Sequence, residues 1–169
     1  NGRDCWTLFI YGNNDKPVQG AHYSLAEVLQ NGGQYFGENQ DEEQAQTEVA
    51  EELELYPDNP DALRLFIRQH ATAEKNPETT EKLKATLSKL NELFNGNEEK
   101  LYSLSFLYSM IGEGAKGKEI EEKIIAENPK GYFARQRHLR PFYSEQDITK
   151  GAEIVNAAFF DTIRIRVPS

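Results

Sequence analysis

The segment from Glu98 to Pro129 places the strongest constraint on what this chain can fold into. Its apolar residues recur at helical spacing in two runs, which Gly112, Gly114 and Gly117 separate. Proline cannot continue a helix, so the second run is expected to end before Pro129. The segment therefore predicts two amphipathic helices joined by a glycine-rich turn. A single helical hairpin cannot bury its own apolar face, so similar units are expected on either side.

The rest of the chain, which has 169 residues, repeats this alternation of helix patterns and breakers. Further helices are predicted over about residues 21–30, 41–56, 61–75, 77–94 and 145–160, with a short one that ends before Pro141. They form pairs over about residues 21–56, 61–95, 98–128 and 130–160, so each pair takes about 31 to 36 residues. This period predicts a mainly α fold, a right-handed α-α superhelix or solenoid of about four helical hairpins.

Apolar stripes identify the residues that are expected to face inward. The clearest stripe, at spacings of four, three and four, consists of Leu83, Leu87, Leu90 and Phe94. Ser144 is predicted to cap the last helix. The expected inner face of that helix consists of Ile148, Ala152, Val155 and Phe159.

Both ends of the chain have the patterns of β segments. Residues 5–11 are rich in β-forming residues and lead into a turn, and Ile163, Ile165 and Val167 alternate with arginines. The expected organisation is a β segment at 1–16, which could end a preceding β-sandwich, a helical-hairpin repeat domain at 17–160, and a β segment or linker at 161–169. Whether the two β segments pair with each other or belong to neighbouring domains stays open.

Charge and composition exclude several classes of function. The net charge is −9, and residues 1–60 carry twelve acidic and two basic residues, which argues against binding to nucleic acid. No apolar run reaches the length of about 20 residues that a membrane span needs. The single cysteine, Cys5, excludes an intrachain disulfide, a CxxC redox pair and a cysteine-based zinc site.

No pattern in the sequence indicates a catalytic residue, a cofactor or a metal. His22, His70 and His138 fall on different predicted helices, so packed or surface histidines are favoured over a metal site. The glutamates at 42, 43, 51, 52 and 54 lack EF-hand spacing. The glycine-rich stretch at 112–117 lacks the ending of a phosphate-binding loop.

The best candidate for specific binding lies between residues 132 and 143. It combines four aromatic side chains with three arginines, a mixture enriched at the anchors of protein interfaces. The candidate interaction residues are Tyr132, Phe133, Arg135, Arg137, Arg140, Phe142 and Tyr143. The alternative, which the sequence favours, is that Phe133, Leu139 and Phe142 pack as a terminal repeat while the arginines face water.

The hairpin at 98–129 resembles a tetratricopeptide repeat. Leu101, Leu104, Ser105 and Tyr108 match the first helix of that motif, and Pro129 closes the unit. The second helix departs from the motif, because Gly117 and Glu121 stand where alanine and a large aromatic residue are usual. The resemblance implies a tetratricopeptide-like helical region.

A second resemblance covers more of the chain. Residues 14–21, NDKPVQGA, resemble a junction in multidomain bacterial envelope proteins of the thioredoxin-like (TlpA/ResA-type) group, where a β-sandwich leads into a helical region. Residues 127–147 resemble the end of such helical regions. The resemblance implies a periplasmic or cell-envelope location and a larger parent protein, but the catalytic CxxC is absent from this chain.

Together these observations predict a non-catalytic interaction or spacer domain whose partner is a protein, a peptide or a neighbouring domain of the same chain. The alternative is a regulatory helical segment of a thioredoxin-like thiol–disulfide oxidoreductase.

Overall fold

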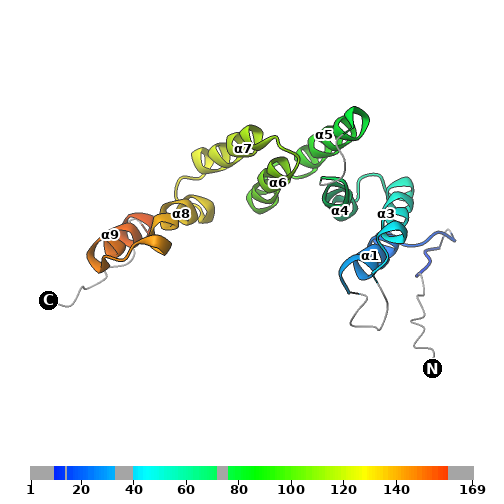
Figure 1. The fold of residues 1–169 in the computed structure, drawn as a ribbon, viewed down its shortest axis with the longest axis horizontal. Helices are drawn as coiled ribbons and strands as arrows, with labels where there is room; N and C mark the ends of the chain where they lie inside the picture. The colour runs from blue at the N-terminus through cyan, green and yellow to red at the C-terminus, as the bar shows by residue number, and fades with distance from the viewer. Residues whose placement is uncertain (1–9, 14, 33–39, 72–75, 160–169) are drawn as a thin grey trace, which may run out of the picture. The chain divides into compact units, whose positions relative to one another are not determined.

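The computed structural model describes residues 10–13, 15–32, 40–71 and 76–159, and over these residues the chain is mainly helical (Figure 1). It forms two compact units. The first contains the chain up to Asn95 with residues 110–112, and the second contains residues 96–109 and the chain from Glu113 onward. The described residues contain no strand, only an isolated antiparallel bridge between Tyr11 and Pro17. The β segment predicted at 161–169 lies outside the described residues, as do residues 1–9 and 14 of the one predicted at 1–16.

The helices of the first unit agree closely with the predicted ones. They are α1 (Ala21–Glu27), which continues as the π-helix η1 (Val28–Gly32), α3 (Glu42–Leu55), α4 (Pro60–His70) and α5 (Pro77–Leu93). Side chains of Asp41, Asn59 and Asn76 accept hydrogen bonds from the first free backbone N–H groups of α3, α4 and α5. These caps, with proline in the first turn of α4 and α5, explain why the helices begin where the sequence predicts.

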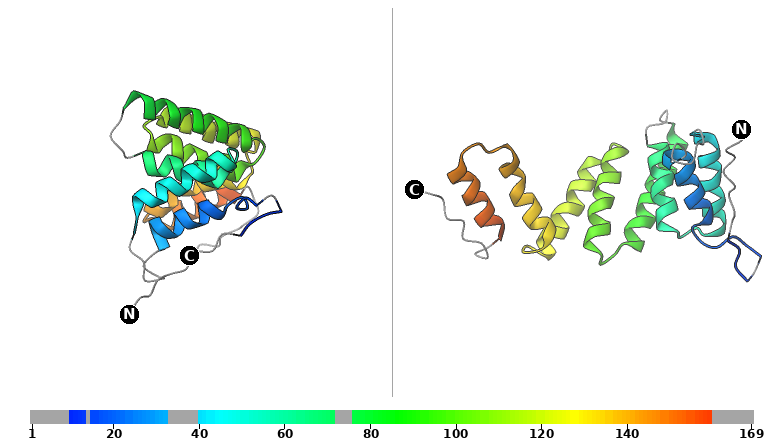
Figure 2. Two further views of the ribbon diagram at one scale, coloured as in Figure 1. Left: turned by 90° about the vertical axis from the view of Figure 1, so that its right-hand side faces the viewer. Right: turned by 90° about the horizontal axis from the view of Figure 1, so that it is seen from below.

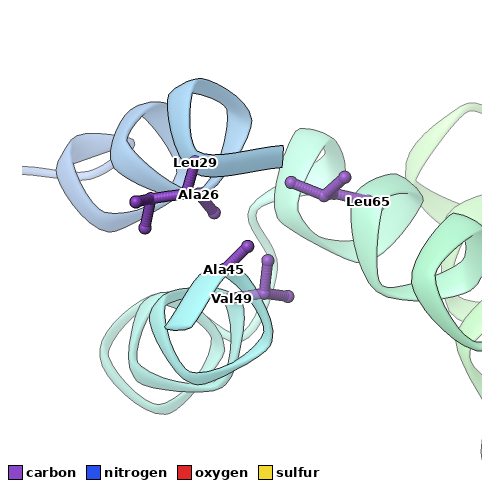
Figure 3. Packing of buried hydrophobic residues seen from close by; sticks show 5 residues of the cluster. All are labelled: Ala26, Leu29, Ala45, Val49 and Leu65. Atoms are coloured by element: carbon purple, nitrogen blue, oxygen red, sulfur yellow. The ribbon is translucent and has the colours of Figure 1, made fainter. Parts of the chain in front are cut away.

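A hydrophobic core lies where α1, α3 and α4 meet (Figure 3). Its fully packed members are Ala26, Leu29, Ala45, Val49 and Leu65. Ala26 and Ala45 are both inaccessible to solvent, and these small side chains let α1 and α3 approach closely. The core therefore fixes the spacing of the two helices.

The inward stripe predicted on α5 is confirmed. Leu83, Leu87, Leu90 and Phe94 are all buried. Gly96, just beyond the helix, has a φ of +79°, a left-handed conformation that glycine adopts without strain. The predicted end of this helix near residue 94 is therefore confirmed as well.

The helices of the second unit are α6 (Glu98–Met110), apart from its last residue, α7 (Gly114–Glu127), α8 (Tyr132–Leu139), the 3-10 helix η2 (Arg140–Ser144) and α9 (Ile148–Phe159). Helices α8 and α9 pack side by side (Figure 2). The predicted hairpin at 98–129 is confirmed, since α6 and α7 run antiparallel, with Asn128 donating a hydrogen bond of 2.9 Å to Glu98.

The α6–α7 contact depends on two small residues. A Cβ atom placed on Gly117 would lie 2.5 Å from the carbonyl oxygen of Ser105, closer than real Cβ atoms approach. The hydroxyl of Ser105 donates toward the backbone oxygen of Tyr102 and toward Oε1 of Glu121, at 2.7 and 3.1 Å. Glu121 therefore makes a polar contact within the hairpin.

Two predictions for the last helix are wrong. Helix α9 begins at Ile148 rather than near Glu145, because the side chain of Asp147 accepts hydrogen bonds from the backbone N–H groups of Thr149 and Lys150. Ser144 does not cap it; its hydroxyl donates to the oxygen of Pro141 within η2.

The inner face of α9 agrees only in part with the predicted one. Ile148 is 75% exposed, whereas Ala152, Val155 and Phe159 are half-buried. The fully buried positions are Gly151 and Ala158, which were not predicted. The ring of Phe142 lies against Gly151, where a Cβ atom would be 3.3 Å from it. None of the helices in the described ranges has the length and apolar character that a membrane span requires.

Candidate functional site

The structure separates the seven candidate interaction residues into an exposed set and a packed set. The exposed residues, which we call the aromatic–arginine surface, are Tyr132, Arg137, Arg140, Phe142 and Tyr143. Tyr132 is 65% exposed, whereas its neighbour Phe133 is only 9% exposed. Arg135 is half-buried. Leu139, named with Phe133 and Phe142 as a packed residue, is half-buried, but Phe142 is exposed.

Phe133 and Arg135 hold α8 in place. The ring of Phe133 stacks on Tyr102 of α6 with centroids 4.4 Å apart, and Tyr132 meets Phe133 edge-on at 5.1 Å. The guanidinium carbon of Arg135 lies 5.7 Å from the centre of the Phe159 ring, within range of a cation–π contact. These packed residues therefore set the orientation of the exposed aromatic residues.

The two exposed arginines form loose contacts with neighbouring helices. Arg137 lies 3.5 Å from Glu122, and Arg140 lies 3.9 Å from Glu121 and donates a hydrogen bond of 3.0 Å to the hydroxyl of Tyr102. Exposed ion pairs of this kind contribute about 0–1 kcal/mol. Exchanging their partner for a carboxylate of another molecule therefore costs little.

A second polar cluster, which the sequence did not predict, lies between α1 and α3. His22 and Glu48 are buried, and Nδ1 of His22 is 2.7 Å from Oε2 of Glu48 and 3.2 Å from Oε2 of Glu51. The Glu51 side chain is 53% exposed, so one side of the cluster is open to solvent. The three donor atoms all lie within 4.8 Å of one another. We call these three residues the His22 cluster.

Glu52, one turn further along α3, is fully buried and organises the backbone beside this cluster. Its carboxylate accepts hydrogen bonds from the backbone N–H groups of Gly20 and Tyr23, at 2.7 and 3.4 Å, and from Nδ2 of Asn59 at 2.6 Å. A buried carboxylate is tolerated only when donors of this kind replace water. Glu52 thus holds the residues on both sides of His22 against α3.

The helical period places these buried acids on the inner face of α3, but it does not show that they are buried. Glu48 and Glu52 follow Ala45 by three and seven residues, so they share the face of α3 that carries Val49. Charged residues are normally expected on the outer face of a helix. His22 lies four residues before Ala26, which is itself buried, and so it shares a face with the core in the same way.

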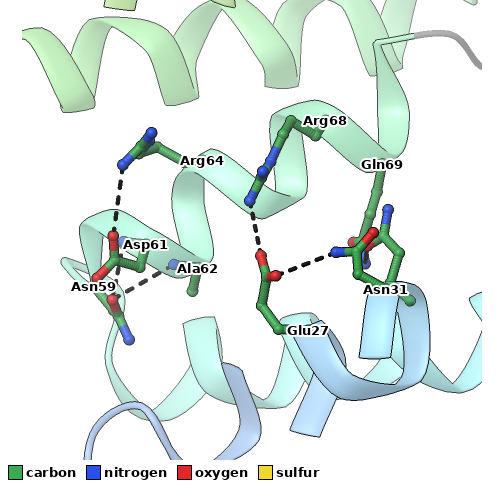
Figure 4. A network of polar contacts seen from close by, with 9 residues as sticks. Glu27, Asn31, Asn59, Asp61, Ala62, Arg64, Arg68 and Gln69 are labelled. Atoms are coloured by element: carbon green, nitrogen blue, oxygen red, sulfur yellow. Dashed lines mark hydrogen bonds and ion pairs between the residues drawn. The ribbon is translucent and has the colours of Figure 1, made fainter. Parts of the chain in front are cut away.

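Polar contacts also join α1 to α4 at the surface (Figure 4). Glu27 accepts hydrogen bonds from Arg68 at 2.8 Å and from Asn31 at 3.2 Å. Burial raises the pKa of Tyr23, and the negative charges of Glu27 and Asp61 raise it further. This network is a structural link between helices.

Of the other predicted candidates, His70 and His138 stay apart from the His22 cluster. Nδ1 of His70 lies 2.8 Å from the backbone oxygen of Phe66 within α4, and His138 is exposed on α8 in the second unit. Glu42, Glu43 and Glu54 are exposed on α3. Comparison with models of protein families, with curated proteins and with solved structures finds no match to this chain.

Proposed function

We propose that this chain is a non-catalytic helical-repeat domain that binds an acidic segment of a protein partner through the aromatic–arginine surface. The observation that carries the proposal is the grouping of three exposed aromatic side chains and two exposed arginines within twelve residues. Tyrosine and arginine are enriched among the residues that dominate binding energy at protein interfaces. A monomeric surface has little other reason to expose aromatic rings together.

The charge of this region supports an acidic partner. Residues 130–169 carry seven basic and four acidic residues, whereas the whole chain has a net charge of −9. A partner carboxylate can replace Glu122 beside Arg137, since that ion pair is exposed, and a second one can approach Arg140, which is exposed and lies 3.9 Å from half-buried Glu121. The flanking rings then supply apolar contact area.

The repeat architecture is part of the same proposal. The sequence predicts four helix pairs of about 31 to 36 residues each, and the α6–α7 hairpin has small residues at its closest contact. We take these hairpins to be tetratricopeptide-like units of a right-handed α-α superhelix. Such arrays present extended surfaces for protein segments.

Binding of labelled peptides to the purified chain tests the proposal. One panel carries aspartate and glutamate among leucine and proline, and a matched panel carries lysine in place of each acid. Fluorescence anisotropy should show binding of the acidic panel alone, weakening as salt is raised. Tyr132→Ser and Tyr143→Ser should each reduce the affinity about tenfold or more, the effect of an interface anchor.

Tyr11→Ser is the matched control, because Tyr11 is an exposed tyrosine of the first unit. It should leave binding unchanged. Equal binding of both panels, no binding of either, or an equal loss in Tyr11→Ser would each contradict the proposal.

A further inference from the structure

We infer that His22, Glu48 and Glu51 form a binding site for one divalent transition-metal ion between α1 and α3. This site is independent of the aromatic–arginine surface, since all three residues belong to the first unit. One imidazole nitrogen and two carboxylate oxygens, from two helices, lie within 4.8 Å of one another. Nothing in the proposed peptide-binding function requires this arrangement.

The distances between the donor atoms suit a shared ion. Metal–ligand bonds to histidine nitrogen and carboxylate oxygen are about 2.0–2.2 Å long, so two donors on one ion lie about 3.0–3.4 Å apart when they are adjacent. Nδ1 of His22 lies 2.7 Å from the Glu48 oxygen and 3.2 Å from the Glu51 oxygen. The Glu48 and Glu51 oxygens lie within 4.8 Å of each other, and the half-exposed Glu51 side chain is able to move its oxygen toward a shared ion.

The local charge also favours a cation. Glu48, Glu51 and Glu52 are three carboxylates on consecutive turns of α3, two of them buried. Within the described ranges neither a lysine nor an arginine forms an ion pair with any of them, and the only cationic group at the cluster is His22, which is charged only when protonated. A divalent ion balances this excess of negative charge more completely than a single imidazolium does.

The site is held in place before any ion binds. Glu52 fixes the backbone at Gly20 and Tyr23, on both sides of His22, and Ala26 and Ala45 fix the approach of α1 to α3. Supporting contacts of this kind normally orient metal ligands. Glu52 itself is a positioning residue, because its oxygens are occupied by backbone and Asn59 donors.

The donor set selects the class of metal. Calcium and magnesium prefer all-oxygen ligands, whereas an imidazole with two carboxylates suits zinc, cobalt, manganese or ferrous iron. Three protein ligands leave at least one position for water, and the exposed side of Glu51 gives solvent access to it.

Titration of the chelator-treated chain of 169 residues with Co²⁺ and Zn²⁺ tests the inference. Calorimetry should show one site per chain, Co²⁺ should acquire the absorption of a protein-bound ion, and Zn²⁺ should displace it. Because ligands must be deprotonated, binding should weaken as pH falls. Glu51→Gln should weaken binding at least tenfold without unfolding the chain, since its side chain is half-exposed.

Two controls separate this site from general attraction to acidic side chains or to a surface histidine. Glu54→Gln removes the same charge from an exposed position of the same helix, and His138→Gln removes an exposed histidine of the second unit. Both should bind Co²⁺ as the unmodified chain does. The inference is overturned if the chain binds no Co²⁺, if Glu51→Gln binds normally, or if either control loses affinity as Glu51→Gln does.

Discussion

Oε1 of Glu52 on α3 lies 2.6 Å from Nδ2 of Asn59, and both side chains are buried. The same Asn59 side chain uses its oxygen to accept hydrogen bonds from the first backbone N–H groups of α4. One amide therefore caps the N-terminus of α4 and donates a hydrogen bond to a buried carboxylate of α3. The contact with Glu52 needs the NH₂ group of the asparagine as a donor, and the helix cap needs its oxygen as an acceptor. A substitution that keeps the oxygen and removes the NH₂ group therefore tests the first contact alone.

Asn59→Asp should destabilise the chain by more than about 2 kcal/mol at neutral pH. Aspartate caps a helix as well as asparagine does, but it would place a second carboxylate against buried Glu52 and remove the only side-chain donor among the three hydrogen bonds described for Glu52. Urea unfolding monitored by circular dichroism measures the change. Asn76→Asp is the control, because Asn76 caps α5 through an exposed contact, and it should change stability by less than about 0.5 kcal/mol. Equal effects of the two substitutions would show that Glu52 does not depend on the amide.

Gly117→Ala should destabilise the α6–α7 hairpin by about 1–3 kcal/mol, although alanine is the better helix former. The added methyl group meets backbone of α6, the carbonyl oxygen of Ser105 at 2.5 Å, so the helices must separate.

Gly114→Ala, in the first turn of the same helix, is the matched control. Its added methyl group meets nothing closer than Ser109 Oγ at 4.0 Å, and it should be neutral or stabilise by up to about 1 kcal/mol. The two variants are compared by the midpoint of thermal unfolding. A Gly117→Ala chain as stable as Gly114→Ala would mean that the hairpin is looser than its geometry indicates.

The helices were predictable because their signals are local. The stripe from Leu83 to Phe94 has a helical period, and Asn76 with Pro77 marks the start of α5, so position and inward face both follow from neighbouring residues. The buried acids were not predictable in this way. Glu52 is buried because Gly20 and Asn59 supply donors, and only the fold brings these distant residues together.

In a short helix the sequence pattern does not show which side faces inward. Tyr132 and Phe133 are adjacent aromatics in a helix of eight residues, too short for its period to decide which ring faces inward. The stack of Phe133 on Tyr102 of α6 decides it. The start of α9 was ambiguous for another reason, since serine and aspartate both cap helices well and the chain has Ser144 and Asp147 close together. Ser144 is not the cap because it belongs to η2, where its hydroxyl donates to the backbone oxygen of Pro141.

Asp147→Ala should reduce the stability of the chain by about 0.5–2 kcal/mol, the usual effect of removing a helix N-cap. Its carboxylate accepts hydrogen bonds of 2.8 and 3.2 Å from the first turn of α9. Ser144→Ala should change stability by less than about 0.5 kcal/mol, because that hydroxyl bonds only within η2. Urea unfolding compares the two variants. A larger effect at Ser144 would place the start of α9 three residues earlier.

Ionisation of Tyr108 on α6 should lower the free energy of unfolding in alkaline solution. Burial raises the pKa of its phenol, and the nearby charge of Glu113 raises it further, so the folded chain favours the protonated form. A group whose pKa is higher in the folded state stabilises the fold fully below its unfolded pKa, about 10 for tyrosine, and loses this contribution as pH rises through the folded value. The loss of stability above about pH 10 should therefore be smaller in Tyr108→Phe than in the unmodified chain, as measured by urea midpoints across that range.

Glu113→Gln separates the two causes of this shift. It should lower the pKa of Tyr108 only part of the way toward the ordinary tyrosine value, because burial is the larger cause and the substitution leaves it in place. The readout is the tyrosinate absorbance as a function of pH, taken as the difference between each chain and its Tyr108→Phe counterpart. If Glu113→Gln restores the ordinary pKa completely, charge and not burial governs the phenol, and the alkaline instability should then disappear in that variant too.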